Sequence, residues 1–414
     1  MKFDFPKDFL WGAATSAHQV EGNNINSDSW LYEHLPNTNH AEPSLDACDH
    51  YHRYPEDIAL FAALGFNAFR FSIEWARVEP EEGYFSPAII AHYRRVLECC
   101  HKNGIKPVVT LQHNTSPRWL IAQGGWAHPA TPAKFARYCG YVAKHLGDLM
   151  GIAFTINQPN LPIILLREGH LPDVETLATL PWVHEAAKAL GTTPEKIRPH
   201  INANSPNDIR LMIQSHLLAV EAIKNECPKL PTGWTVVADF FETLEGGETR
   251  VNELNRECID QFLEVSAADD IVGLQAYTRF RVGPQGIVPP PAGAEVTDSY
   301  GWEYYPEVLE RCVNYASSKI KVPLLITENG VATTDDSRRV EWIKRSARGA
   351  MNCLQQGHNL HGYLYWSAMD NFEWAAGYRP QFGLIGVNRQ TQERTVKGSA
   401  RLLGQIARQN AITV

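Results

Sequence analysis

The sequence predicts an α/β fold, a single (β/α)8 TIM barrel with its active site at the C-terminal ends of the strands. Short apolar runs rich in β-branched residues recur along the chain with amphipathic helical patterns between them, as in βαβ units that form a parallel sheet. The length of 414 residues suits this fold, because barrels stay one domain while their loops grow. Polar and aromatic residues follow or end several of the runs, which is the catalytic edge of such a barrel. We therefore expect one domain over residues 1–414.

The predicted elements alternate in chain order. Strands are expected at residues 9–13, 68–73, 107–112, 152–157, 234–239, 271–277, 323–328 and 362–366. Helices are expected where apolar residues recur at three- and four-residue spacing, at residues 87–103, 132–149, 209–226, 251–265, 306–318 and 336–356. Three longer loops, at residues 22–47, 166–204 and 279–300, are expected to wall a pocket at the barrel mouth.

Composition and charge exclude several functional classes. A hydrophobic content of 44% and a charged content of 20% are those of an ordinary soluble globular protein with a sizeable core. The formal net charge of -8 and the scattered lysines and arginines argue against a nucleic-acid partner. The first ten residues have no apolar core of a signal peptide, and no stretch has the length and apolarity of a membrane helix. A cytoplasmic protein with no membrane partner is the resulting expectation.

Cysteines and histidines do not indicate a metal site or a cofactor. The eight cysteines lack CxxC spacing and the density of a disulfide scaffold, so they are interpreted as free thiols. His50 and His52 are two residues apart in helix-like sequence and would point to different sides. No set of Asp, Glu and His with ligand spacing accompanies them or His18 and His113. We expect no metal and no cofactor.

One predicted strand ends in a carboxylate and another is followed by an amide. Glu328 closes an apolar run and precedes Asn329-Gly330, a pair that favours a tight turn. Gln158 directly follows the run at residues 152–157. Retaining glycoside hydrolases use two carboxylates that face each other, one as nucleophile and one as acid and base. A strand-end glutamate alone is more often part of an ion pair, and Gln158 has no acidic proton to donate.

Four ordered segments carry a resemblance to a known family. They are residues 9–22, residues 69–75, Thr327-Glu328-Asn329-Gly330 and residues 366–374. Together they resemble the signatures of glycoside hydrolase family 1, the β-glucosidase family, and the resemblance runs from about residue 9 to residue 400. The family pattern after the fourth strand is Asn-Glu-Pro, whereas this chain has Asn157-Gln158-Pro159. The resemblance implies a retaining β-glucosidase-like hydrolase that forms a covalent intermediate on Glu328.

The resemblance also implies the role of individual residues. Arg70 and Tyr277 are expected beside Glu328, where a cation and a phenol would keep it ionised and oriented. Sugar hydroxyls need hydrogen-bond partners, and the apolar face of a sugar ring needs an aromatic platform. The substrate-binding residues carried over from the family are Gln19, His113, Asn157, Trp366, Glu373 and Trp374, with Trp366 as the stacking platform and Glu373 as a charged acceptor. Asp370 is expected to order its own loop.

The expected partner is a small-molecule β-glycoside or oligosaccharide. Residues 373–378 lack the Ser-Lys-Tyr set of the phospho-glycosidases in the family, so a non-phosphorylated sugar is favoured. Gln112, Asn114 and Gln275-Ala276 depart from the common family pattern near the site. The sequence leaves the aglycone, the glycone and the oligomeric state open.

Gln158 leaves three interpretations of the chemistry. The chain is a β-glucosidase in which glutamate was replaced by design, with the activity of this form reduced. Alternatively, it is a natural thioglucosidase-like or transglycosylating enzyme that uses activated leaving groups. In the third interpretation, it is a sugar-binding pseudoenzyme that has kept the pocket and lost the chemistry.

Overall fold

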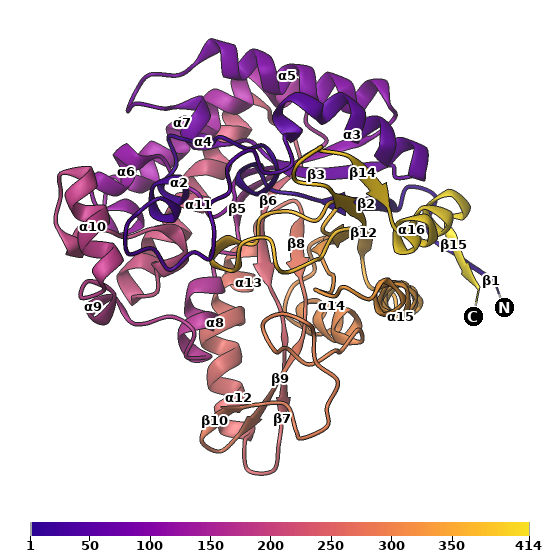
Figure 1. The fold of residues 1–414 in the computed structure, drawn as a ribbon. Coiled ribbons are helices and arrows are strands. Elements are labelled where there is room, and N and C mark those ends of the chain that lie inside the picture. The colour runs from indigo at the N-terminus through magenta and orange to yellow at the C-terminus, as the bar shows by residue number, and fades with distance from the viewer. Residues whose placement is uncertain (1, 414) are drawn as a thin grey trace.

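A closed barrel of eight parallel strands forms the centre of the computed structural model, which describes residues 2–413 (Figure 1). In order around the barrel the strands are β2 (Leu10–Ala14), β3 (Ala68–Ser72), β4 (Lys106–Gln112), β5 (Ile152–Asn157), β6 (Thr232–Val237), β8 (Val272–Gln275), β11 (Leu324–Glu328) and β12 (Leu360–Trp366). Each barrel strand coincides with a predicted run to within two residues. Three small sheets outside the barrel were not indicated by the sequence. The (β/α)8 prediction is therefore confirmed.

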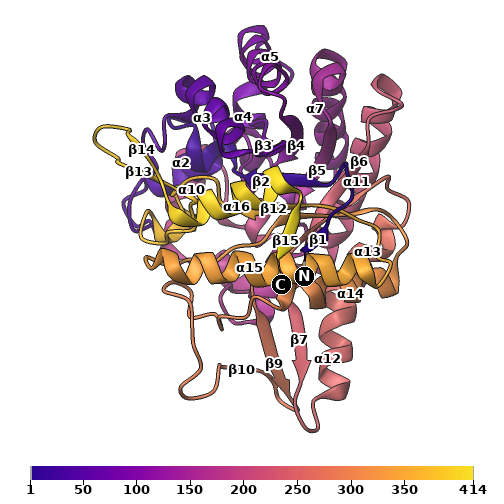
Figure 2. The same ribbon diagram turned by 90° about the vertical axis from the view of Figure 1, so that its right-hand side faces the viewer.

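Helices surround the barrel in both views (Figures 1 and 2). The predicted helices are α5 (Pro87–Lys102), α7 (Thr131–Leu146), α11 (Pro206–Glu226), α12 (Glu248–Asn255), α13 (Gln261–Ser266), α14 (Val308–Lys319) and α15 (Asp336–Gln355). The predicted helix at residues 251–265 is α12 and α13 joined by a π-helical turn, Arg256–Asp260. Two further long helices, α3 (His50–Leu64) and α16 (Gly398–Gln409), were not among the predicted elements.

Segments outside the predicted strands and helices, including the three predicted loops, contain short regular elements. Short helices are α1 (Ala17–Val20), α2 (Asp28–Glu33), α4 (Trp75–Val78), α6 (Arg118–Ala122), α8 (Leu161–Arg167), α9 (Val174–Leu177) and α10 (Pro181–Leu190). Small sheets are formed by β1 (Lys2–Asp4) with β15 (Ala411–Thr413), by β7 (Phe240–Thr243), β9 (Arg279–Gly283) and β10 (Gly286–Val288), and by β13 (Ile385–Val387) with β14 (Arg394–Val396). Helices of one or two turns show too few periods to be recognised in a sequence.

The segment at residues 166–204 packs as a separate unit against the barrel. Leu177, Val183 and Ile197 form an apolar cluster with Tyr32 and Ile121, apart from the main core. The β7–β9–β10 sheet with α12 projects from the barrel in Figures 1 and 2. Both units lie beside the C-terminal ends of the strands, so they shape the mouth of the barrel, as expected of the long connections.

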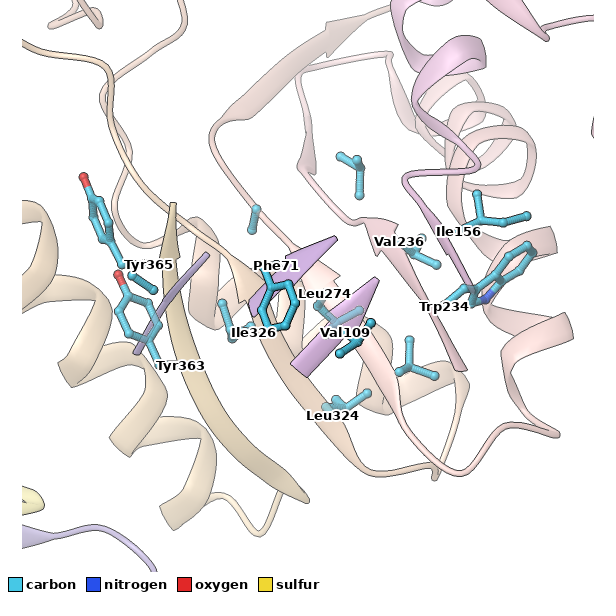
Figure 3. Close-up of a cluster of buried hydrophobic side chains, with 14 of the residues drawn as sticks. Phe71, Val109, Ile156, Trp234, Val236, Leu274, Leu324, Ile326, Tyr363 and Tyr365 are labelled. Atoms are coloured by element: carbon cyan, nitrogen blue, oxygen red, sulfur yellow. The ribbon is translucent and has the colours of Figure 1, made fainter. Parts of the chain in front are cut away.

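The barrel strands alternate between two apolar layers. Leu10, Val108 and Phe154 belong to a small cluster inside the barrel, whereas neighbouring residues belong to the large layer between strands and helices. Figure 3 shows part of this outer layer, including Val109 and Ile156. A packed interior closes the barrel, so that a site can form at its ends rather than through its centre.

Two irregularities in the strands decide what faces the barrel mouth. Leu325 lies in the interior cluster, and strict alternation would put Glu328, three residues on, on the other face. The pairing of β11 with β8 shifts register between Ile326 and Glu328, and β5 shifts against β6 between Phe154 and Asn157. Such bulges re-aim side chains. They turn Glu328 and Asn157 toward the barrel interior.

Candidate active site

Glu328 is held by one hydrogen-bond donor on each carboxylate oxygen. Arg70 Nη1 donates to Oε1 at 2.5 Å, and the Tyr277 hydroxyl donates to Oε2 at 2.5 Å. Arg70 comes from β3, and β2 and β12 separate that strand from β11 in the barrel. The structure thus brings together three residues that the sequence placed at one site. Glu328 is 2% exposed, so the carboxylate is oriented inside a largely dry pocket.

Burial and these two donors act on the protonation of Glu328 in opposite directions. Burial raises the pKa of Glu328, and the positive charge of Arg70 and the hydrogen bond from Tyr277 lower it. Burial and the nearby Glu328 charge raise the pKa of Tyr277 well above its usual value, so Tyr277 remains a neutral donor. Burial is the larger effect and leaves the pKa of Glu328 raised, while the two fixed donors favour the ionised form that a nucleophile needs.

A network that the sequence did not indicate fixes Arg70. Its Nη2 donates to Asn157 Oδ1 at 2.6 Å and its Nε donates to Thr110 Oγ1 at 3.0 Å. Asn157 Oδ1 also accepts hydrogen bonds from Gln275 Nε2 at 2.8 Å and from Thr235 Oγ1 at 3.1 Å. A buried guanidinium is costly unless it is paired and hydrogen-bonded, and this network meets that need. Inward-facing polar positions at strand ends are the signal that could have identified these partners.

His113 is neutral, and its hydrogen bond to Asn157 fixes where its proton lies. Burial, with a further contribution from the Arg70 charge, lowers the pKa of His113 well below its usual value. Asn157 has its Oδ1 occupied by Arg70, so its Nδ2 faces His113 Nε2 at 3.3 Å and donates to it. The ring proton is then on Nδ1, which is buried without a partner among residues 2–413. His113 can therefore donate one hydrogen bond to a ligand.

Aromatic rings surround His113. The Trp366 ring lies 5.6 Å from it, centroid to centroid, at an interplanar angle of 20°. The Trp374 ring lies 6.4 Å from His113 and stacks on His18 at 5.7 Å and 6°. The structure thus places both tryptophans at the site. Flat rings of this kind bind the apolar face of a sugar.

Glu373 and Gln19 lie on neighbouring segments but differ in how freely they can bind. The Gln19 amide is held within the protein, since Oε1 accepts from Ser16 Oγ at 2.7 Å and Nε2 donates to the Phe372 carbonyl at 2.7 Å. Glu373 Oε1 accepts one hydrogen bond, from Asn371 Nδ2 at 3.2 Å. Burial raises the pKa of Glu373 to about 8, against hydrogen bonds from Trp366 and Asn371. The charged acceptor expected from the sequence therefore stays a prediction, and the raised pKa makes its charge sensitive to pH near neutrality.

Gln158 occupies an unusual backbone position at the end of β5. Its φ is +50°, a left-handed conformation that is uncommon for residues other than glycine. Its backbone N–H donates to the Thr235 carbonyl at 2.9 Å. Gln158 is nearly buried, at 8% exposure, yet within the described chain its side-chain amide makes no hydrogen bond to another residue. β6 and β8 separate β5 from β11, so Gln158 and Glu328 end strands that lie apart around the mouth.

The residues after Glu328 matter for close packing. Asn329 Nδ2 donates to the Ala276 carbonyl at 2.6 Å, and its Oδ1 accepts from Trp342 Nε1 at 2.9 Å. A Cβ atom on Gly330 would lie 1.8 Å from the Trp366 carbonyl oxygen. The expected tight turn is not the reason for this glycine, because Gly330 does not adopt a positive φ. Glycine is required because two backbone segments meet beside the site.

Two aromatic residues of the 279–300 connection and its continuation were missed by the sequence reasoning. Trp302 packs 5.8 Å from Tyr277, and Tyr300 stacks on Trp302 at 4.9 Å. Both rings therefore stand at the rim beside the residues that hold Glu328.

Asp370 has the ordering role expected of it, because it accepts from the Gly383 N–H at 2.8 Å and pairs with Lys397 at 2.7 Å.

His50 and His52 each contact an aspartate, and the cysteines form no disulfide. His50 Nδ1 lies 2.8 Å from Asp57 Oδ2, and His52 is on the exposed side of α3. All eight cysteines are free thiols, as predicted. From residue 2 to residue 413, no cluster of three or more His, Cys, Asp or Glu has the arrangement of a metal site. Over the same range, every helix is too short or too polar to cross a membrane.

Comparisons with known proteins point to one family. The model of glycosyl hydrolase family 1 matches residues 1–225 and 290–412. The chain is 31% identical to β-glucosidase A of Acetivibrio thermocellus, over 99% of each chain. It is 30% identical to a β-glucosidase of Agrobacterium sp., over 97% of this chain and 95% of the relative. Among solved structures, β-glycosidase BGL167 superposes with a TM-score of 0.95 at 49% identity, over 99% of this chain and 98% of that one.

Proposed function

The chain belongs to glycosyl hydrolase family 1 and is a glycoside hydrolase of the β-glucosidase type, and we propose that it cleaves a terminal, non-phosphorylated β-D-glycoside through a covalent sugar ester on Glu328. The observation that carries this proposal is the pair of donors on the buried carboxylate. Arg70 and Tyr277 each bind a different oxygen of Glu328, which orients the carboxylate toward the pocket. These two partners lie with the carboxylate at the C-terminal ends of the barrel strands, where the active sites of such barrels form.

In the first step, a Glu328 oxygen attacks the anomeric carbon while the bond to the leaving oxygen breaks. Arg70 and Tyr277 keep the carboxylate ionised and aligned until the new bond forms. A carboxylic acid at position 158 would protonate the leaving oxygen, but Gln158 has no such proton. The reaction then depends on how well the leaving group departs without a proton, and positioned acids contribute about a hundredfold to ten-thousandfold in rate.

In the second step, water must break the ester on Glu328. The same position would supply the base that activates this water. Gln158 can only hold a hydrogen bond, so release of the sugar is slow and the ester accumulates. These consequences hold whether glutamine is native at this position or was introduced there.

The remaining site residues support sugar binding. His113 Nδ1 has an unused proton to donate, and the two oxygens of the Glu373 carboxyl can accept further hydrogen bonds besides those from Asn371 and Trp366. Trp366 and Trp374 supply ring faces for the apolar side of a pyranose. Asn157 and Gln19 complete the set, with Asn157 held by Arg70 and Gln19 by its neighbours.

A stereochemical assay tests this proposal. Hydrolysis of 2,4-dinitrophenyl β-D-glucoside, with enough protein for the slow release of sugar to outpace mutarotation and followed by proton NMR, should show β-glucose appearing before the α-anomer, because two displacements retain configuration. Glu328→Gln should abolish this release and keep the fold. Early formation of α-glucose would contradict the proposal, and so would full activity of Glu328→Gln.

A further inference from the structure

Asn160, two residues after Gln158, is fully buried, and its side-chain amide binds only backbone groups. Its Oδ1 accepts from the Val237 N–H at 3.0 Å, and its Nδ2 donates to the Val237 carbonyl at 2.7 Å. The same Nδ2 donates a second hydrogen bond, to the Cys258 carbonyl at 2.9 Å. Both N–H groups of this amide are therefore used, and neither is free to bind a substrate.

Asn160 is the N-cap residue of α8, but its side chain does not cap that helix. An asparagine at an N-cap usually accepts a hydrogen bond from the backbone N–H two or three residues further on. The Asn160 side chain makes no such bond to α8. Its three hydrogen bonds all reach other segments, namely the end of β6 and the π-helical turn Arg256–Asp260. Helix capping therefore does not account for this side chain.

The end of β6 holds residues 158–160 at two points. The Gln158 N–H donates to the Thr235 carbonyl at 2.9 Å. Two residues further along both segments, the Asn160 side chain pairs with the N–H and the carbonyl of Val237. These contacts extend the pairing of β5 with β6, which ends with Asn157 opposite Thr235, and a side chain takes the place of backbone at the last point. The tripeptide is thus attached to the barrel at both of its ends.

The backbone of Gln158 depends on this attachment. Its φ of +50° is costly for a residue with a side chain, and such a conformation persists only where the surrounding structure holds it. Pro159, the next residue, has no N–H with which to hold the turn. The Thr235 carbonyl on one side and Asn160 on the other are therefore the anchors of Gln158. The direction in which the side chain at 158 leaves the backbone follows from where these anchors lie.

The second partner of Asn160 belongs to an irregular turn. Cys258 lies in the π-helical turn Arg256–Asp260, which joins α12 to α13. Turns of this kind are rare, and many of them occur at functional sites. Through the hydrogen bond from Asn160 to the Cys258 carbonyl, this turn is in contact with the segment that carries residue 158.

We propose that Asn160 is a positioning residue for the side chain at 158 and sets where that side chain meets the leaving oxygen. This inference rests on the proposed function, in which position 158 acts on the leaving oxygen. A group that transfers a proton must lie within hydrogen-bond reach of its target, and a displacement of about 1 Å can cost a hundredfold in rate. Loss of Asn160 therefore matters most when residue 158 carries an acid and the leaving group needs a proton.

A double-mutant cycle between positions 158 and 160 tests this role. The measured quantity is kcat/KM on cellobiose, whose leaving group needs a proton, and on 2,4-dinitrophenyl β-D-glucoside, whose leaving group does not. In the Gln158→Glu protein, Asn160→Ala should lower kcat/KM on cellobiose by about tenfold to a hundredfold and spare the dinitrophenyl glucoside. In the protein that has Gln158, the same change should leave the ratio of the two rates as it was. Asn160→Asp, which keeps the shape and the acceptor for the Val237 N–H, should lose less than Asn160→Ala, and it carries the test if Asn160→Ala does not fold.

Asn67 supplies a matched control at the opposite end of the barrel. Its Oδ1 accepts from the Trp11 N–H at 2.7 Å, and its Nδ2 donates to the Phe9 carbonyl at 3.0 Å. Asn67→Ala should lower the thermal transition and leave the ratio of the two rates unchanged.

The outcomes separate the two proposals. If Gln158→Glu brings no gain on cellobiose, the proposed role of position 158 fails. If the gain appears but neither Asn160 variant reduces it, the inference about Asn160 is wrong. It is also wrong if an Asn160 variant slows both substrates equally, or if Asn67→Ala changes the ratio as much, because either result is that of a general loss of structure.

Discussion

The two sides of the barrel mouth differ in how their buried carboxyl groups are held. Around Glu328, each donor of the Arg70 guanidinium that faces the site is bound, and Asn157 Oδ1 accepts three hydrogen bonds. On the side of Glu168, a carboxyl oxygen is buried without a partner, and the Gln158 amide makes no hydrogen bond to the described residues. The first side holds its carboxyl group with fixed donors, and the second leaves hydrogen-bonding groups without a partner in the described protein.

This difference follows from the chemistry expected of each side. The nucleophile must keep one position and one charge state, which fixed donors provide before the substrate arrives. On the leaving-group side, residue 158 must meet the leaving oxygen, so its side chain finds its partner only in the complex. Asp239 lies between the two sides, with Oδ1 bound by the Tyr277 N–H at 2.6 Å and a pKa raised by burial to about 7.

The largest expected effect comes from restoring a carboxyl group at position 158, on the leaving-group side of the barrel mouth. Gln158→Glu should raise the hydrolysis of cellobiose by about a hundredfold to ten-thousandfold, because an acid then protonates the leaving oxygen. The gain on 2,4-dinitrophenyl β-D-glucoside should be much smaller in the first step, since that leaving group needs no proton. Initial rates on both substrates measure this. Gln158→Met, which has similar length and no acid, serves as the matched control, and equal gains on both substrates would contradict a leaving-group role.

A smaller effect on catalysis is expected when one of the two hydrogen-bond donors to Glu328 is removed. Tyr277→Phe removes one of the two donors on Glu328, and a hydrogen bond to a charged group contributes about 1.5–3 kcal/mol. We expect kcat/KM on nitrophenyl glucosides to fall by about tenfold to a hundredfold while the thermal transition changes little.

Tyr138→Phe is the control for this change. The Tyr138 hydroxyl is buried and lies within hydrogen-bond distance of the Ile73 and Leu111 carbonyls, at 2.9 and 3.0 Å, away from Glu328. This variant should lose stability and keep its kcat/KM. A Tyr277→Phe variant with unchanged kinetics would show that Arg70 alone holds the carboxylate.

Glu373 is expected to couple sugar binding to pH. Hydroxyl donors from a sugar favour the charged carboxylate, so binding lowers its pKa from about 8 and releases a proton. Affinity for glucose-type ligands should therefore fall as the pH drops below about 8 and level off above it. Calorimetry in two buffers of different ionisation enthalpy measures the proton released.

Glu373→Ala should weaken sugar affinity and remove this pH dependence, because the charged acceptor is lost. Glu373→Gln should also remove the pH dependence while keeping part of the affinity. Unchanged affinity in Glu373→Ala would show that the family role does not extend to this residue.

Residues at the strand ends could be predicted from the sequence, whereas residues in the long connections could not. All eight barrel strands were predictable, because each is a short apolar run between helical patterns. Glu328, Arg70, Tyr277 and Asn157 could be placed together, because strand ends meet at one face of a barrel and the family motifs identify them. The contacts of Thr235 and Gln275 with Asn157 depend on a register shift in β5 that no residue pattern signals. Glu168 and Trp302 come from connections whose path is set by packing, so the cavity that they line together could not be predicted.

The central claim is that Glu328 forms a covalent ester that is slow to break because residue 158 has no carboxyl. Incubation with 2,4-dinitrophenyl β-D-glucoside, followed by intact-mass spectrometry and peptide mapping, tests it most directly. The predicted result is a protein heavier by one hexosyl unit, with the sugar on Glu328, which azide discharges as the β-glucosyl azide. A burst of dinitrophenol without an adduct on Glu328, or an azide product of α configuration, would contradict the account.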